Sequence, residues 1–462
     1  MKNKIYWLIL ILVAIGVGVF LVLISKPSVV EKFISPKEEK KIETKLTIGV
    51  GYSILKDSKE AVREAFDAMM QKSERKDPSF VILTSTVGYD QEQVLIEVKK
   101  LLPKKTKIYG YTSLMGIMTN DGFKIGEGVK EGGVLSLTGF FSEDMAFGVG
   151  AADLSEGVSA KEVAEIAARR ALENAGNRRV SPKIVLMSTS PFGIGEHLAI
   201  AGVENVLGKK IPIVGGGVAA GYSDLVSGGE ALFANEKVYQ KGVVVTLVYT
   251  DLKIGHAFLS GFNPTGHKGI VTEMKTDEKG IHIVKIDNKP AAQVYNNWLD
   301  GKFKDYLGTS EMFLDKAVNY TFGIKIIEAD ESINWQMIVP FHFNPDDSIT
   351  VGAIAPEGTE LYLLESNPDL FIKRAGLATR LARGRGEITE TEIAGVVLDQ
   401  CGGTLLGIPG IDGWNKMIDE VAKASGNAPF IGVSNLGPYG YFLGVGNRYG
   451  EVTASITVFG KY

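Results

Sequence analysis

Hydroxyl-bearing side chains follow two apolar segments at matching places in the chain, and they are the first residues that could bind a ligand. Thr84-Ser85-Thr86 follows Phe80–Leu83, and Ser188-Thr189-Ser190 follows Ile184–Met187. Hydroxyl groups at the end of a strand can hydrogen-bond a carboxylate or an amide, or they can cap the next helix. The sequence leaves both roles open.

Glycines and short polar residues follow the next apolar segment in each part of the chain. Gly215, Gly216 and Gly217 lack side chains, so their backbone N–H groups can approach a ligand closely. Asp90 and Asp224 lie in loops and could hold an amino group. The complete set of candidate ligand-binding residues is Thr84, Ser85, Asp90, Thr112, Ser113, Ser188, Thr189, Ser190, Gly215, Gly216, Gly217, Asp224, Cys401, Ser434 and Asn435.

Cys401 is the single cysteine, and a thiol at the end of a strand could act as a nucleophile. No histidine can be paired with it from the sequence, and the alternative is a small buried residue. The segment Gly432–Gly437 is too long for the Gly-x-Ser-x-Gly elbow of serine hydrolases. The five histidines never occur at His-x-x-x-His spacing, so we expect no metal site and no cofactor.

The elements that must position these residues form a repeated unit. Val185-Leu186-Met187 repeats Val81-Ile82-Leu83 104 residues later, and Ile213-Val214-Gly215 repeats Ile108-Tyr109-Gly110 105 residues later. In each copy a strand, a helix and a second strand form a parallel crossover unit, which brings the carboxyl ends of its strands together. Such regular spacing indicates an internal duplication.

A looser third copy closes the chain, with an expected first strand at Leu361–Leu364, a helix at Asp369–Arg383 and a buried strand at Val396–Leu398. We expect hairpins of residues 123–129 with 133–140 and of residues 441–446 with 452–459. The predicted fold is α/β, with repeated strand-helix-strand-helix-strand-hairpin units forming layered mixed sheets after one transmembrane helix.

The beginning of the chain predicts a membrane anchor. Residues 5–24 form an apolar run long enough to cross a bilayer as a helix, and no Ala-x-Ala cleavage site follows it. The expected organisation is an anchor at 1–25, a charged tether at 26–45 and two domains at 46–265 and 266–462. We expect the domains to lie outside the cytoplasm, because long domains translocate largely regardless of flanking charge.

Composition excludes one class of partner. The chain has 462 residues and a net charge of −4, with lysine and arginine spread throughout. No basic face interleaved with aromatic residues is evident, so nucleic acid is not an expected partner.

Short motifs occur at Gly110–Ser113, Pro212–Gly216, Gly261–Gly266, Val271-Thr272, Ile286–Ala291, Tyr295, Cys401, Phe430–Gly432 and Gly437-Pro438. Together they resemble the FIST family of sensory domains over most of the chain after the tether. The resemblance implies binding of a small molecule in signal transduction, with amino acids as a ligand class, a signalling protein as partner and no enzymatic activity; a hydrolase using Cys401 or a loop serine is the alternative. The chain departs from the family pattern at Tyr111-Thr112-Ser113, Gly116, Thr404 and Asn435.

Overall fold

The computed structural model describes residues 44–71, 73, 77–125, 133–157, 159–190, 195–218 and 229–462. Lys45–Tyr462 is one compact unit. The predicted anchor and tether lie outside the described residues, except for the last two positions of the tether. Within the described part, no helix is both long enough and apolar enough to cross a membrane.

Mixed sheets with helices packed against them form the fold, and in the described part the strands form four sheets. The first sheet contains, in spatial order, β1 (Thr47–Ser53), β6 (Leu135–Phe141), β2 (Phe80–Ser85), β3 (Lys107–Thr112), β10 (Leu232–Ala234) and β11 (Lys237–Tyr239). The helices packed on it are α3 (Ser58–Gln71) and α4 (Gln91–Leu101).

The second and third sheets have the same plan. The second contains β7 (Met145–Asp153), β12 (Gly242–Thr250), β8 (Ile184–Thr189), β9 (Ile213–Gly217), β24 (Pro438–Phe442) and β25 (Gly446–Tyr449), with α5 (Ala160–Asn174) and α6 (Glu196–Leu207). The third contains β13 (Ile254–Ser260), β26 (Thr453–Gly460), β22 (Ile393–Cys401), β23 (Phe430–Asn435), β4 (Ile117–Thr119) and β5 (Gly122–Lys124), with α9 (Pro368–Arg385), α10 (Gly402–Leu406) and α11 (Gly410–Ala424).

Each of these sheets repeats one pattern of pairing. An antiparallel pair (β1–β6, β7–β12 or β13–β26) is followed by a buried strand, and this strand pairs in parallel with the next one (β2–β3, β8–β9 and β22–β23). The repeated unit therefore occurs three times. Its third copy differs from our expectation, because its first strand is β13 and not Leu361–Leu364.

The outer edge of each sheet is completed by a hairpin from another copy. Hairpin β4–β5 of the first copy pairs with β23, β10–β11 of the second copy pairs with β3, and β24–β25 of the third copy pairs with β9. The two predicted hairpins are therefore wrong. Phe123 pairs with Met118 and Tyr441 pairs with Asn447, while β6 and β26 each lie between two strands of their own copy.

A fourth sheet is inserted between β13 and α9. It separates the first strand of the third copy from its helix, so this copy is harder to recognise in the sequence. It packs around its own apolar core, which includes Tyr295, Phe322 and Phe343. Its elements are β14 (Asn263–Asp277), β15 (Gly280–Ile286), β16 (Lys289–Pro290), α7 (Ala291–Trp298), α8 (Leu314–Ala317), β17 (Tyr320–Ile327), β18 (Ile333–Ile338), β19 (Pro340–Phe343), β20 (Ile349–Val351) and β21 (Glu360–Glu365).

Alternation along the buried strands separates an inner and an outer core. Phe80 and Ile82 of β2 join an inner cluster that also contains residues from the second and third sheets, among them Leu186 and Val397. Val81 of β2 faces the opposite way and packs with the apolar side of α3 and α4. The inner faces of three sheets therefore share one core.

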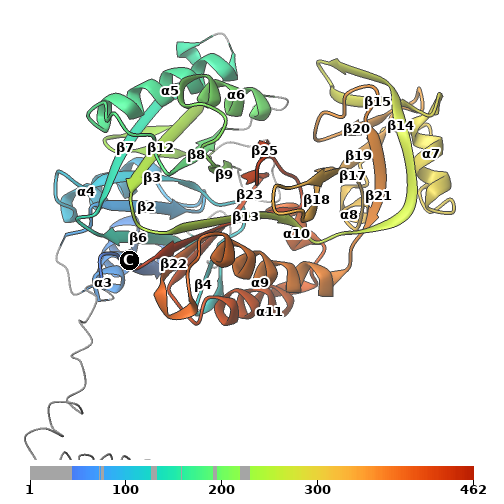
Figure 1. Ribbon diagram of the computed structural model, residues 1–462. Helices are drawn as coiled ribbons and strands as arrows, with labels where there is room; N and C mark the ends of the chain where they lie inside the picture. Colours follow the sequence, from blue (N-terminus) through green and yellow to red (C-terminus); the bar gives the residue numbers. More distant parts are fainter. Residues whose placement is uncertain are drawn as a thin grey trace, which may run out of the picture. The chain divides into compact units, whose positions relative to one another are not determined.

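Figure 1 shows α9 and α11 of the third copy side by side, as their contacts also indicate.

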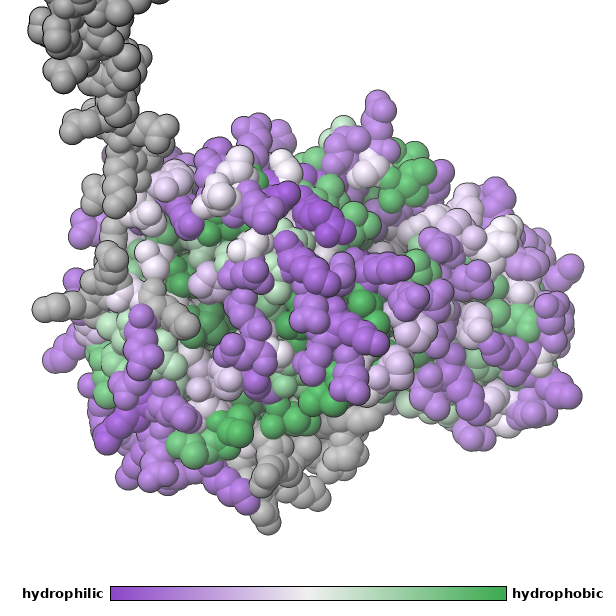
Figure 2. All heavy atoms as spheres, turned by 90° about the horizontal axis from the view of Figure 1, so that it is seen from below, coloured by the Kyte–Doolittle hydropathy of each residue, from purple (hydrophilic) through white to green (hydrophobic). Residues whose placement is uncertain are grey.

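Figure 2 shows hydrophilic residues over much of one face, with hydrophobic residues in separate groups between them. The large apolar side chains that remain exposed in the described part come from separate segments, such as Ile96 on α4 and Val180 and Met312 in loops. Polar side chains also lie in the interior, among them Thr84, Ser188 and Asp399, one from each copy.

Candidate functional site

Three polar residues occupy equivalent inner positions, one in each copy. A glycine of the parallel partner strand marks the register, because Leu83 pairs with Gly110, Met187 with Gly215 and Leu398 with Gly432. The next residue along each buried strand is Thr84, Ser188 or Asp399. These three side chains share a face with Ile82, Leu186 and Val397, which belong to the inner core.

The residues paired with these three complete a ring at the carboxyl ends of the strands. Each copy contributes one residue from its buried strand and one from the parallel partner. The third residue comes from the antiparallel neighbour of the buried strand, which is β6, β12 or β26 and is called the closing strand. We call these nine residues the central ring: Thr84, Tyr111, Ser136, Ser188, Gly216, Val244, Asp399, Val433 and Ser455. All are buried.

Asp399 is the charged residue of the ring. Tyr111 donates its hydroxyl hydrogen bond to Asp399 Oδ1, and Asn435 Nδ2 lies 3.4 Å from the same oxygen. No lysine or arginine of the described chain pairs with this carboxyl. Burial raises the pKa of Asp399 to about 7, because the charged form loses its hydration. The ring therefore contains a carboxyl group that lacks a positive partner.

Several polar atoms of the site also lack a hydrogen-bond partner in the described part of the chain. They are Thr84 Oγ1, Ser136 Oγ, Ser455 Oγ and Asn435 Oδ1. Leaving a buried polar group without a partner costs about 1–3 kcal/mol. Ser188 differs, because its Oγ lies 2.6 Å from the hydroxyl of Tyr109. These atoms could therefore hydrogen-bond a ligand.

The three predicted glycines lie within a strand, and their contact with a ligand stays a prediction. Gly215, Gly216 and Gly217 belong to β9 itself, and β9 lies between β8 and β24. A Cβ at Gly216 would overlap the side-chain amide of Asn435. Glycine there lets Asn435 lie across β9 and reach Asp399.

Several predicted hydroxyl groups hold the chain together instead of facing the ring. Ser85 Oγ donates to Gln91 Oε1 over 2.6 Å, Thr112 Oγ1 accepts from the backbone of Ala231 over 3.1 Å, and Thr189 Oγ1 lies 2.5 Å from the hydroxyl of Tyr439. These contacts tie strands to neighbouring elements.

The remaining polar predictions are also placed by the structure. Ser113 Oγ donates to Gly116 O and accepts from the backbone of Ser434. Asp90 caps α4 by accepting from Gln93 N over 3.0 Å. Ser434 Oγ is buried without a partner, but it lies on the strand face opposite Asn435 and outside the ring. Asp224 lies outside the described residues.

Cys401 occupies the position that Thr86 and Ser190 occupy in the other copies. Thr86 Oγ1 accepts from Val134 N over 3.1 Å, and Ser190 Oγ accepts from Gly242 N over 3.0 Å. The thiol of Cys401 likewise accepts backbone N–H groups, one of them from Val452. Burial raises the pKa of Cys401 to about 11. Its equivalent residues thus indicate a structural role.

Sequence reasoning missed Asp399, Tyr111, Ser136 and Ser455. Asp399 carried a usable signal, because it is a carboxylate inside the apolar strand Ile393–Cys401. Such a residue is rarely buried without a purpose. Ser136 and Ser455 could have been found only by aligning the closing strands of the three copies.

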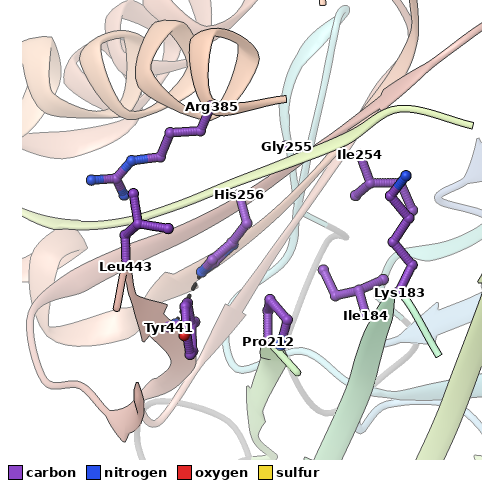
Figure 3. A pocket seen from close by; sticks show the side chains of 9 residues that line it. All are labelled: Lys183, Ile184, Pro212, Ile254, Gly255, His256, Arg385, Tyr441 and Leu443. Atoms are coloured by element: carbon purple, nitrogen blue, oxygen red, sulfur yellow. Dashed lines mark hydrogen bonds between the residues drawn. The ribbon is translucent and has the colours of Figure 1, made fainter. Parts of the chain in front are cut away.

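A cavity of about 150 Å³ lies away from the ring, between the second and third sheets (Figure 3). His256 lines it, and both of its ring nitrogens are used: Nδ1 lies 3.0 Å from Ile456 O, and Nε2 accepts from Tyr441 N over 3.1 Å. Arg385 lines it too and pairs with Glu328 and Asp330. Because these polar groups are satisfied, the central ring is the stronger candidate.

Two solved structures are weakly similar to the chain. A cyanuric acid hydrolase from A. caulinodans aligns at 8% identity over 90% of this chain and 100% of that chain, with a TM-score of 0.33. PurL from T. maritima, complexed with ATP, aligns at 9% identity over 90% of this chain and 71% of that one, with a TM-score of 0.20. With TM-scores this low, these two alignments establish neither the fold nor the function of the chain.

Family comparison is decisive. No curated protein matches the chain. The FIST N domain matches residues 79–289, and the FIST C domain matches residues 291–440. The two matches lie in order and together include β2, β8 and β22, the buried strands of all three copies. The chain belongs to the FIST family.

Proposed function

We propose that this protein is a sensor that binds a small solute with a protonated amine, such as an amino acid, at the central ring. FIST domains are sensory, ligand-binding domains of signalling proteins. The observation that supports the amine is Asp399, a buried carboxyl with no positive partner in the described chain.

The chemistry around Asp399 suits an ammonium group. An ammonium has three hydrogen-bond donors and no acceptor. Asp399, Thr84 Oγ1 and Asn435 Oδ1 offer acceptors, and the oxygens of Thr84 and Asn435 have no other partner among the described residues. A cation beside Asp399 would lower the pKa of its carboxyl, so affinity for the amine rises with pH as Asp399 ionises near pH 7.

A melting screen of the full-length chain tests this proposal. Amino acids and simple amines are compared with their N-acetyl counterparts, which keep the shape and lose the charge. We expect a saturable rise in Tm with a free amine and none with its acetylated form, because stabilisation follows ligand occupancy. Equal shifts with both forms would refute recognition of the ammonium group.

Two variants locate the site. Asp399→Asn should abolish the shift, since the amide has no charge to pair with the amine. Asp90→Asn is the matched control, because it makes the same substitution at an exposed helix cap where asparagine also functions. An Asp399→Asn protein that binds the amine as tightly as wild type would place the site elsewhere.

For the alternative function, a hydrolase using Cys401 or a loop serine, the buried thiol of Cys401 is poorly suited to act as a nucleophile. Burial raises the pKa of the thiol to about 11, so little thiolate exists at neutral pH. The five histidines all lie in the described part, and none of their hydrogen bonds there involves the thiol.

Membrane attachment is also part of the proposal. It is supported by the apolar run of residues 5–24. We infer that this segment anchors the two FIST domains outside the cytoplasm, and that a separate signalling protein receives the signal. Alkaline carbonate extraction should leave the chain in the membrane fraction, and added protease should digest the domains in intact cells stripped of their wall. Release by carbonate would contradict the anchor.

A further inference from the structure

A positively charged residue is buried on the apolar side of helix α9. Arg374 follows the spacing of Phe371, Ala375 and Ala378, which are all buried in the core of the third copy. Only 3% of Arg374 is exposed. This position would normally carry an aliphatic side chain.

The guanidinium of Arg374 has only neutral partners. Nη1 donates to Val452 O over 2.9 Å, and Nη2 lies 3.3 Å from Thr404 Oγ1. Nε has no partner, and no carboxylate of the described chain pairs with the group. Burial lowers the pKa of Arg374 to about 9. Since buried charges are normally paired, a counter-ion is missing here.

One edge of the guanidinium keeps unused hydrogen-bond donors among the described residues. Nε and Nη2 form one edge of its planar fork, and this edge has only the long contact with Thr404. Such an edge binds two oxygens of a carboxylate or phosphate at once. The opposite nitrogen, Nη1, is fixed by Val452 O and packs against Gly261, where a Cβ would lie 3.2 Å away.

The backbone beside Arg374 is strained. Val452 has a φ of +42°, a conformation that β-branched residues rarely adopt. Its N–H group is bound by the thiol of Cys401, and its carbonyl is bound by Arg374. Strained residues that neighbours hold in place concentrate at binding sites.

We propose that Arg374 anchors a second binding site, which takes the oxyanion group of a small solute. The oxyanion pairs with the Nε and Nη2 edge, and the hydroxyl of Thr404 donates to it. This site is built by α9, α10 and the turn at Val452, and it does not depend on the amine proposed for the central ring.

Melting of the full-length chain in sodium acetate, phosphate or sulfate tests the site, with sodium chloride at equal ionic strength as reference. We expect a saturable rise in Tm with at least one oxyanion beyond that in chloride. The three salts distinguish a carboxylate ligand from a phosphate or sulfate ligand. If none exceeds chloride, the proposal fails without any variant.

Variants then assign the response to Arg374. Arg374→Lys keeps the charge and loses the fork, so the apparent oxyanion affinity should fall at least about tenfold. Arg170→Lys is the matched control, because Arg170 is partly exposed and already paired with Glu156. Unchanged affinity in Arg374→Lys overturns the assignment.

A second variant covers the case in which Arg374→Lys does not fold. Thr404→Val removes one hydroxyl at nearly constant volume and should weaken the oxyanion response several-fold, while unchanged affinity overturns the role of this edge. Asp399→Asn should leave the oxyanion response intact, which separates this site from the central ring.

Discussion

Replacing Asp399 by asparagine should change how the stability of the protein depends on pH. The carboxyl has a pKa of about 7 in the folded chain, raised from 3.8 by burial. Between these values the folded state holds the proton and the unfolded state has released it. The free energy of unfolding therefore falls as pH rises through this window, and it levels off above pH 7.

The magnitude follows from the size of the shift. A rise from 3.8 to about 7 corresponds to a total loss of about 4 kcal/mol, at 1.36 kcal/mol per pKa unit. The same relation places about 2.5 kcal/mol of this loss between pH 5 and pH 8.5. The amide of asparagine does not titrate, and its oxygen still accepts from Tyr111. The variant should thus gain stability relative to wild type as pH rises.

Thermal unfolding of both proteins from pH 5 to pH 8.5 measures this difference. For a chain of this length, about 2.5 kcal/mol corresponds to roughly 3 °C in Tm. Glu451, whose pKa burial raises to about 8, adds a similar slope to both proteins, so it cancels in the comparison. A constant difference in Tm across the range would show that Asp399 is not held in a desolvated site.

Three further substitutions or treatments test the site and its surroundings. Gly216→Ala should push Asn435 off β9 and cost about 1–3 kcal/mol of stability, whereas Gly384→Ala, where a Cβ meets nothing, should be neutral or slightly stabilising in urea unfolding. Cys401 should resist iodoacetamide at pH 8 until the protein is unfolded, as mass spectrometry would show; rapid native labelling would contradict its burial. Thr84→Val should change the stability of the free protein by less than about 1 kcal/mol in urea unfolding yet weaken amine binding in titrations, and unchanged binding would remove Thr84 from the site.

Local elements could be predicted from the sequence because their signals are local. The sequence of residues 369–383 predicts the helix observed at Pro368–Arg385, and the apolar runs at 80–83 and 184–187 predict the strands that the structure extends to Ser85 and Thr189. Repetition at a nearly constant offset also predicts that these strands are equivalent.

Strand partners could not be predicted in the same way. Met118 pairs with Gly432, more than 300 residues later, and the sequence around Met118 carries no mark of this partner. Expecting each hairpin to close on its nearest neighbour therefore gave the wrong pairs. Long-range register depends on shape and burial that only the assembled sheets define.

The candidate site was predicted only in part. Thr84 and Ser188 do occupy equivalent positions, but they face a shared interior and not an open sheet edge. Their role in binding a ligand stays a prediction. Cys401 was predicted as a candidate because its thiol is reactive. Asp399, two residues earlier, was not predicted, although its buried carboxyl has no positive partner in the described chain. Periodicity shows which way a side chain points, but not whether a partner will reach it.

The exchange of hairpins among the three copies sets a limit on dissecting this protein. A fragment that ends after β12 would lack β24–β25 and leave β9 with a bare edge, and it would hold β4–β5 with no β23 to receive it. Bare strand edges recruit other chains, so such fragments should aggregate. Chains cut at the boundary between the two FIST domains would therefore report on misassembled halves and not on independent modules.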